Sequence, residues 1–227
     1  MRSQDAIVVR AADRFVTQGD DVRSRHCFSF GAHYDPANTH FGPLQACNEE
    51  TLAPGAGFDS HAHEGVDIVT WVAEGLLEHA DSAGGRALTG PGVVQVLHAG
   101  SGVSHSERNA GAGECRFIQS WIAADPPDGP PSYEQIDARP VLADGTLAPV
   151  LDLQSGTARM YAGRLPPGAG SPLPPAQRLH LYVVRGAVTL DGVGLLADGD
   201  SARLTTVGRA GAVAGENGAE ILVWALA

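Results

Sequence analysis

Two short motifs in the first half of the chain carry side chains that could bind a metal ion. His61 and His63 lie two residues apart, and the same spacing separates His105 from Glu107. Residues two apart on a β-strand point to the same face of a sheet, so each pair could converge on one ion. If the two strands face each other inside a barrel, three imidazoles and one carboxylate would meet. This mixture of ligands suits Fe, Mn, Co, Ni, Cu or Zn.

The second pair is what makes the first informative. A lone His-x-His motif is often no more than exposed polarity, but here a glycine-containing segment precedes each pair. We therefore predict one divalent metal ion bound by His61, His63, His105 and Glu107. Affinity alone cannot choose the metal, and four protein ligands would leave two open positions on an octahedral ion. Glu107 could be a ligand only, or a ligand that also acts as a general base toward a substrate hydroxyl group.

Several further residues are candidates to line or support the site. Asp67 shares the face of His63 by strand parity, so it could orient a ligand imidazole. Gln119 and Trp121 share one face of their strand. They could line the cavity, although an aromatic residue on a barrel strand usually belongs to the core. His98 could lie in the pocket as well.

The remaining histidines have plainer interpretations. His79, like His98, could line the pocket mouth, but such histidines more often lie on the outer surface of a strand, and we favour that interpretation. His26 and His33 could pack over the barrel or be satisfied by the backbone. His180 has no second ligand nearby in the sequence, so we expect it to be structural.

The elements that would position these residues are predicted to be β-strands. Runs rich in Val, Ile, Leu and Trp end at glycine-containing turns, and no window of 12 or more residues has a sustained helical period. Many short strands at close spacing indicate a sandwich or barrel. The clearest of these runs are 66–75, 92–100, 116–124, 178–192 and 219–227.

A proline-rich stretch divides the chain. Residues 124–135 contain four prolines and cannot hold a central strand. Beyond them the pattern begins again, since residues 69–84 loosely resemble residues 181–194. We therefore predict two copies of one small barrel, a metal-binding domain at 1–135 and a second domain at 136–227.

Composition excludes some functions. The net charge is −11 and the chain has no Lys, so a nucleic-acid-binding surface is not expected. No apolar run reaches the length of a membrane helix and no signal segment opens the chain. Three cysteines with no Cys-x-x-Cys motif suit reduced thiols. These features predict a soluble, cytoplasmic protein that binds neither nucleic acid nor membrane.

Taken together, the motifs resemble those of the cupin superfamily, and most closely its pirin branch. Cupins carry Gly, His-x-His, an acid and Gly, followed by Gly, Pro, Gly, His and Asn. The matching residues here are Gly55, His61, His63, Asp67, Gly75, Gly85, Pro91, Gly92, His105 and Asn109. The pirin-like segments are 26–36, 41–50, 54–84, 90–109 and 117–122.

The resemblance implies an all-β fold of two tandem cupin barrels, also called double-stranded β-helices or jelly rolls. It implies a metal ion, commonly iron as Fe(II), in the N-terminal barrel and a degenerate second cupin. The ligands would be His61, His63, His105 and Glu107. Several bacterial pirins cleave the flavonol quercetin with dioxygen, and others are described as regulators that bind protein partners.

This chain departs from the usual pirin pattern near the site. Glu64 stands where Arg is usual, Asp67 where Glu is usual, and His98 where a small residue is common. These changes bear on substrate preference more than on metal binding. We expect a metal-dependent dioxygenase that acts with dioxygen on a flavonol-like or enol-bearing aromatic. The alternatives are a regulator acting through a protein partner, or a zinc or nickel cupin with other chemistry.

Overall fold

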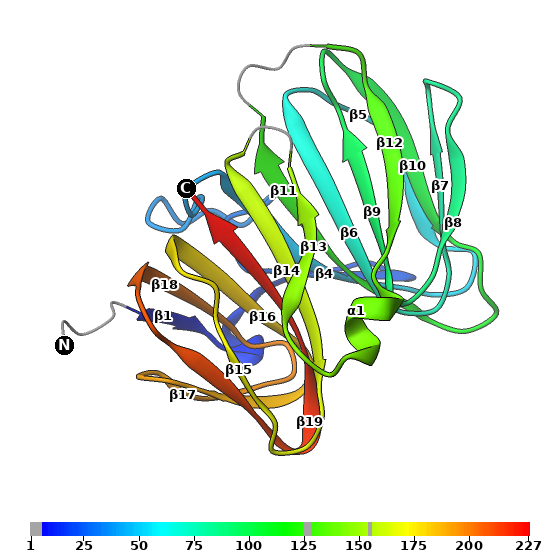
Figure 1. The fold of residues 1–227 in the computed structure, drawn as a ribbon. Helices are drawn as coiled ribbons and strands as arrows, with labels where there is room; N and C mark the ends of the chain where they lie inside the picture. The colour runs from blue at the N-terminus through cyan, green and yellow to red at the C-terminus, as the bar shows by residue number, and fades with distance from the viewer. Residues whose placement is uncertain (1–5, 125–128, 154–155) are drawn as a thin grey trace. The chain divides into compact units, whose positions relative to one another are not determined.

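The computed structural model describes residues 6–124, 129–153 and 156–227 of the 227-residue chain. Strands paired in antiparallel fashion are the main regular structure of the described residues, and the single α-helix among them is five residues long (Figure 1). The predicted all-β fold is therefore confirmed. No helix in these three segments is long and apolar enough to cross a membrane.

The chain forms two compact units. The first, which we call the histidine unit, contains Phe15–His40 and Leu44–Asp137. The second, which we call the apolar unit, contains residues 6–14, Phe41–Pro43 and Ala138–Ala227. The division into domains at 1–135 and 136–227 stays a prediction. Part of the proline-rich stretch, residues 125–128, lies outside the described residues.

The histidine unit is built from eleven strands in two sheets. One sheet has the order β12-β9-β6-β11-β4-β3-β2, and the other has the order β5-β10-β7-β8. The strands are β2 (Phe15–Gln18), β3 (Val22–His26), β4 (Leu44–Leu52), β5 (Gly57–His63), β6 (Val66–Glu74), β7 (Leu77–Asp81), β8 (Arg86–Thr89), β9 (Val93–His98), β10 (Val103–Asn109), β11 (Cys115–Ala123) and β12 (Ser132–Asp137).

Residue types explain the places of these strands. Strand β6 lies near the middle of the seven-stranded sheet, and its run of Val, Ile and Trp is buried from Val66 to Ala73. Strand β5 is an edge strand with mostly exposed residues. The two are joined through Gly65, whose φ of +61° suits glycine in a tight turn. Strand β12, which follows the proline-rich stretch, is also an edge strand.

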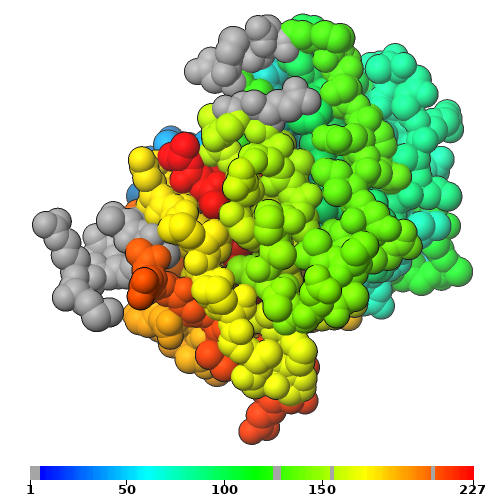
Figure 2. Space-filling model, viewed as in Figure 1, coloured from blue at the N-terminus to red at the C-terminus, as the bar shows by residue number. Residues whose placement is uncertain are grey.

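The apolar unit is built around one eight-stranded sheet. Its central strands, β16 and β19, pair along most of their length, and β1 pairs with β18 (Figure 1). The yellow, orange and red segments of this unit lie side by side in Figure 2. Its elements are β1 (Ala6–Val9), a 3-10 helix (Ala11–Asp13), α1 (Arg139–Ala143), β13 (Ala148–Asp152), β14 (Ala158–Leu165), β15 (Gly170–Pro172), β16 (Ala176–Leu190), β17 (Gly194–Ala197), β18 (Ser201–Val207) and β19 (Gly211–Leu226).

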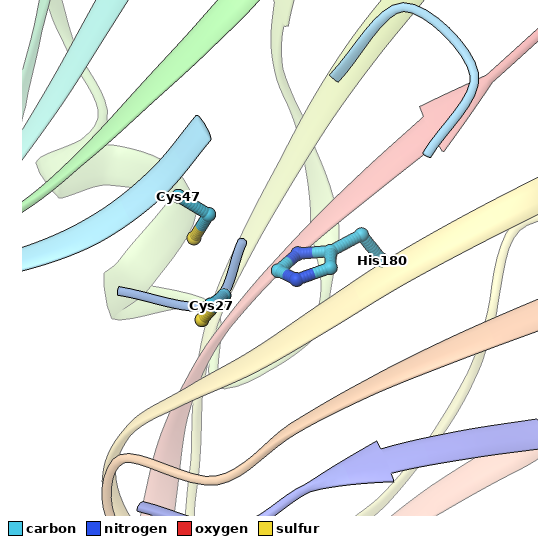
Figure 3. Close-up of side chains that lie close together, drawn as sticks. All are labelled: Cys27, Cys47 and His180. Carbon is cyan, nitrogen blue, oxygen red and sulfur yellow. The ribbon is translucent and has the colours of Figure 1, made fainter. Parts of the chain in front are cut away.

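The thiols and the isolated histidine lie in buried positions. No disulfide joins Cys27, Cys47 and Cys115, all of which lie in the described histidine unit. The Cys27 amide donates a hydrogen bond to the Cys47 carbonyl oxygen at 3.0 Å, and Figure 3 shows both side chains. His180, also drawn there, is a buried residue of β16 in the apolar unit.

Candidate metal centre

Strands β5 and β10 bring three of the predicted ligands together. In their antiparallel register His61 lies directly opposite His105. His63 follows two residues after His61, on the same face. One ring nitrogen from each of the three histidines lies within 4.8 Å of the other two. The sequence predicted this convergence on the condition that the two strands lie together, and their pairing is what the structure adds.

Two backbone features shape this part of the sheet. The β5–β10 register shifts between His105 and Glu107, where two residues of β10 match three of β5, so the irregularity is a β-bulge in β5 between Phe58 and His61. Beside this bulge, β5 passes so close to β10 that a Cβ atom on Gly57 would lie 2.0 Å from the Glu107 carbonyl oxygen. Only glycine fits there, so the glycine before the first histidine pair is needed for the two strands to meet.

The three imidazoles are prepared to bind a cation. The His61 Nδ1–H donates to the Asp59 carbonyl oxygen at 2.8 Å, which leaves Nε2 with its lone pair. Within the described residues, His63 Nε2 and both ring nitrogens of His105 have no hydrogen-bond partner. Burial, together with the neighbouring His61, lowers the pKa of His63 to about 4 and that of His105 to about 3. At neutral pH both rings are therefore uncharged and able to ligate.

Glu107 is held from the opposite sheet. Its two carboxylate oxygens accept hydrogen bonds from Gln95 at 3.0 Å and from Gln119 at 2.8 Å. The side chain is buried, and burial raises the pKa of its carboxyl group. Its nearest candidate co-ligands are His105 and His79, with which it forms a second group within 4.8 Å. His105 thus belongs to both groups.

The interpretation of His79 as an outer-surface residue was wrong. His79 is 0% exposed, because it lies directly opposite Glu107 in the β7–β10 register and so shares the inner face of the sheet. Its Nε2 lies 2.9 Å from Asp81, and its ring stacks on Tyr133 with centroids 4.4 Å apart. Burial alone would raise the pKa of Asp81, but the hydrogen bond from His79 and two backbone amides hold it below its usual value.

The other predicted supporting residues fall into two places. Gln119 contacts Glu107 directly, and Trp121 Nε1 donates to the Gln119 side-chain oxygen at 3.1 Å. Asp67 and His98 instead pair with each other, with 2.8 Å between Asp67 Oδ1 and His98 Nδ1, and this contact raises the pKa of His98. Asp67 lies beyond the turn at Gly65, so strand parity with His63 does not carry over to it.

A cavity of about 430 Å³ adjoins the cluster. Three aromatic side chains line it, namely those of Phe30, Phe58 and Trp121. The polar side chains in its wall are those of Ser24, Asn48, Glu50, Asp59, His61, Glu107 and Gln119. A planar aromatic molecule with polar groups would fit this mixture, in which apolar walls bind and a few polar groups orient.

Two polar residues of the site were missed from the sequence. Gln95 interrupts the apolar run of β9, and Glu50 stands beside Glu49 in a strand that is otherwise largely buried. A polar residue in the middle of a buried strand was the available signal. This signal could not identify Gln95 and Glu50 as site residues, because the neighbouring sequence does not show which face of a strand is the inner one.

Comparison with known proteins places this site in a family. Residues 8–122 match the family model of pirin. A Mycobacterium tuberculosis protein named "Putative quercetin 2,3-dioxygenase" is 42% identical over 226 residues, which cover 95% of this chain and 92% of that protein. The quercetin 2,3-dioxygenase of Escherichia coli is 33% identical over 183 residues, covering 75% and 77%.

A solved structure agrees with these relatives over the whole chain. The bacterial pirin YhhW of Escherichia coli, in a structure described as a complex with nickel(II), has a TM-score of 0.85 and 27% identity. The match covers 98% of this chain and 99% of that one. The predicted resemblance is thus confirmed, and the chain belongs to the pirin family.

Proposed function

We propose that this chain is a metal-dependent dioxygenase that cleaves a flavonol or a related enol-bearing aromatic. The observation that carries the proposal is the three-histidine cluster, one member of which, His61, lines the same aromatic-lined cavity as Glu107. Relatives that cover most of the chain are named for quercetin 2,3-dioxygenase activity. Both observations favour the enzyme over a protein that acts only through partners.

The residues present fit a divalent metal ion. Buried ring nitrogens without hydrogen-bond partners normally cost stability, and a cation is what would satisfy them. His61, His63, His105 and Glu107 would hold the ion, and we propose Fe(II), which this nitrogen and oxygen ligand set suits. When bound, the metal would lower the pKa of the substrate's enol oxygen and hold that oxygen beside dioxygen.

The chain's own side chains would bind the substrate and move its proton. Phe30, Phe58 and Trp121 would pack against the rings of the substrate and exclude water. Glu107 would take the proton of the enol hydroxyl group, since its raised pKa makes the ionised carboxylate a stronger base. The amides of Gln95 and Gln119 would keep the carboxylate in place during this transfer.

The overall reaction balances with dioxygen as the oxidant. Both oxygen atoms enter the products, the heterocyclic ring of the flavonol opens, and one ring carbon leaves as carbon monoxide. The rest of the substrate becomes an ester in which the carboxyl group of one aromatic acid is joined to a phenolic hydroxyl group of a second aromatic acid. No further reductant is needed.

The test is oxygen-dependent loss of quercetin absorbance with untagged protein reconstituted anaerobically with Fe(II). We expect turnover by the wild type and at least a hundredfold loss in His61→Ala and Glu107→Ala. His40→Ala, which changes an exposed histidine, is the matched control and should keep full activity. Fully metal-loaded wild type without turnover of any flavonol would overturn the dioxygenase proposal.

A further inference from the structure

One wall of the cavity carries polar groups that the proposed chemistry does not use. Ser24, Asn48 and Glu50 lie on β3 and β4, away from the strands that hold the histidines. Asn48 is 3% exposed and Glu50 is 5% exposed, yet both line the cavity. Burying amide and carboxyl groups costs stability unless their hydrogen bonds are made, and a polar ligand in the cavity could make those that the protein leaves open.

The sheet register places this wall beside the reacting end of the site. Asn48 lies directly opposite Gln119 in the β4–β11 pairing, and Gln119 contacts Glu107. The wall is therefore one strand spacing, about 4.8 Å, further along the same inner face. In the same pairing Glu50 lies opposite Phe117, so a ligand that reaches from Glu107 across Gln119 would meet Asn48, with Glu50 two residues away on the same strand.

Asn48 has donors to offer. Its side-chain oxygen accepts a hydrogen bond from His26 Nδ1 at 3.0 Å, and His26 Nε2 lies 2.9 Å from the Thr17 hydroxyl oxygen. These contacts fix the orientation of the amide. In the described part of the chain no further hydrogen bond engages the Asn48 amide nitrogen, whose two N–H groups are available to an oxygen of a ligand.

Glu50 offers the complementary group. The Ser24 hydroxyl donates a hydrogen bond to Glu50 Oε2, which leaves Oε1 for the cavity. Burial, with smaller contributions from Glu107 and Glu49, raises the pKa of Glu50 to about 8 despite the opposing effect of Ser24. A carboxyl group kept neutral by its surroundings can donate a hydrogen bond as well as accept one.

We infer that Asn48 and Glu50 are specificity-determining residues, which bind hydroxyl groups on the part of an aromatic substrate remote from the histidines. The inference rests on the proposed function and adds which residues of the cavity bind the ring hydroxyl groups of the flavonol. Phe30, Phe58 and Trp121 would hold the ring faces. Asn48 and Glu50 would bind the hydroxyl groups of the rings. A ring without hydroxyl groups would leave these two polar side chains without partners, which is costly.

The test compares quercetin with 3-hydroxyflavone, which keeps the reactive enol and lacks the other ring hydroxyl groups. Anaerobic calorimetry with zinc-loaded protein measures the Kd of both ligands. Wild type should bind quercetin at least about tenfold more tightly, as expected for one or more buried hydrogen bonds. Asn48→Leu and Glu50→Leu should each reduce this preference to threefold or less, mainly by weakening quercetin binding.

Two variants keep the result interpretable. Glu50→Gln keeps a neutral hydrogen-bonding group and should retain most of the preference. Gln45→Leu changes an exposed residue of the same strand and should leave both Kd values unchanged. Melting curves of all variants would confirm that each is folded.

The inference fails if both Leu variants keep the preference, if they weaken both ligands equally, or if wild type binds neither flavonol. Failure of the proposed function would look different. The binding preference would respond to the variants as expected, but Fe(II)-loaded wild type would consume no dioxygen with either flavonol.

Discussion

The apolar unit and the histidine unit are both antiparallel β-structures, but their interiors hold different side chains. In the apolar unit, Leu, Val, Ile and Ala side chains from β14, β16, β18 and β19 form one large buried cluster. In the histidine unit, apolar clusters such as that around Val72 and Phe117 share the interior with His105, Glu107 and Gln95.

The difference shows what β-pairing does and does not demand. Main-chain hydrogen bonds and alternation of faces set up the sheets in both units. The inner face can then carry apolar side chains, which stabilise the unit, or polar ones, which create a site and leave buried groups without partners until a ligand binds. The contrast is one of degree, since the apolar unit also buries polar side chains such as His180, Arg203 and Glu220.

The largest effect is expected at His105. His105→Leu should weaken metal binding by more than about 100-fold, because changes to residues that only support a ligand already cost 10–100-fold. The apoprotein should not lose stability, since Leu replaces a buried ring whose nitrogens have no described partner. Competition titration with a chelator gives the affinity, and urea unfolding gives the stability. A clear loss of apoprotein stability would show that the ring is packed as core.

The counterpart in the apolar unit is Leu181, which is fully buried in the large cluster. Leu181→Ala should lower the free energy of unfolding by about 2–5 kcal/mol through lost burial and the cavity left behind. Metal stoichiometry should stay unchanged at temperatures where the variant is folded. Calorimetric unfolding and elemental analysis would test both parts. Loss of metal in the folded variant would contradict the separation of roles between the two units.

Glu50 should make the apoprotein less stable as the pH rises. Its pKa is about 8 in the folded chain against an ordinary 4.5. Between these values the folded state keeps a proton that the unfolded chain has lost, so stability falls with rising pH by at most about 1.4 kcal/mol per pH unit. Glu50→Gln cannot titrate at this position. In urea unfolding, its free energy of unfolding should therefore rise relative to that of the wild type from pH 5 to 8. Parallel pH profiles would show that Glu50 is ionised in the folded protein.

The smallest effect is expected at Gln119. Gln119→Leu removes one of the two amides that hold Glu107 and leaves Gln95 in place, so metal affinity should fall by about tenfold. The same chelator competition measures it. Gln18→Leu, at an exposed position, is the control and should bind metal as the wild type does. An unchanged affinity in Gln119→Leu would mean that Gln95 alone positions the carboxylate.

Local sequence pattern predicted much of this structure, and its errors have physical causes. His61 and His63 share a strand face, as do His105 and Glu107. The sequence could predict this because the alternation of side chains along a strand depends only on neighbouring residues. The prediction that Asp67 shares a face with His63 does not hold, because the turn at Gly65 ends one strand and begins another, and alternation does not continue across it. An alternating pattern says which residues share a face, but it does not say which face is inner.

Contacts between distant segments were beyond such reasoning. Gln95 joins Glu107 across two sheets, and His79 is inward only because β7 pairs with β10 in one register. The pairing of β1 with β18 joins segments nearly 200 residues apart. Register of this kind depends on the whole assembled sheet rather than on the residues of one strand.

The most direct test of the central claim is X-ray absorption spectroscopy of untagged protein loaded with one equivalent of Zn²⁺. If His61, His63, His105 and Glu107 hold the ion, the first shell will contain only nitrogen and oxygen at about 2.0–2.2 Å, with the multiple scattering of imidazole rings. Glu107→Leu and His105→Leu should lose this spectrum together with the metal. Sulfur at about 2.3 Å would place the ion on cysteine thiols instead and contradict the account.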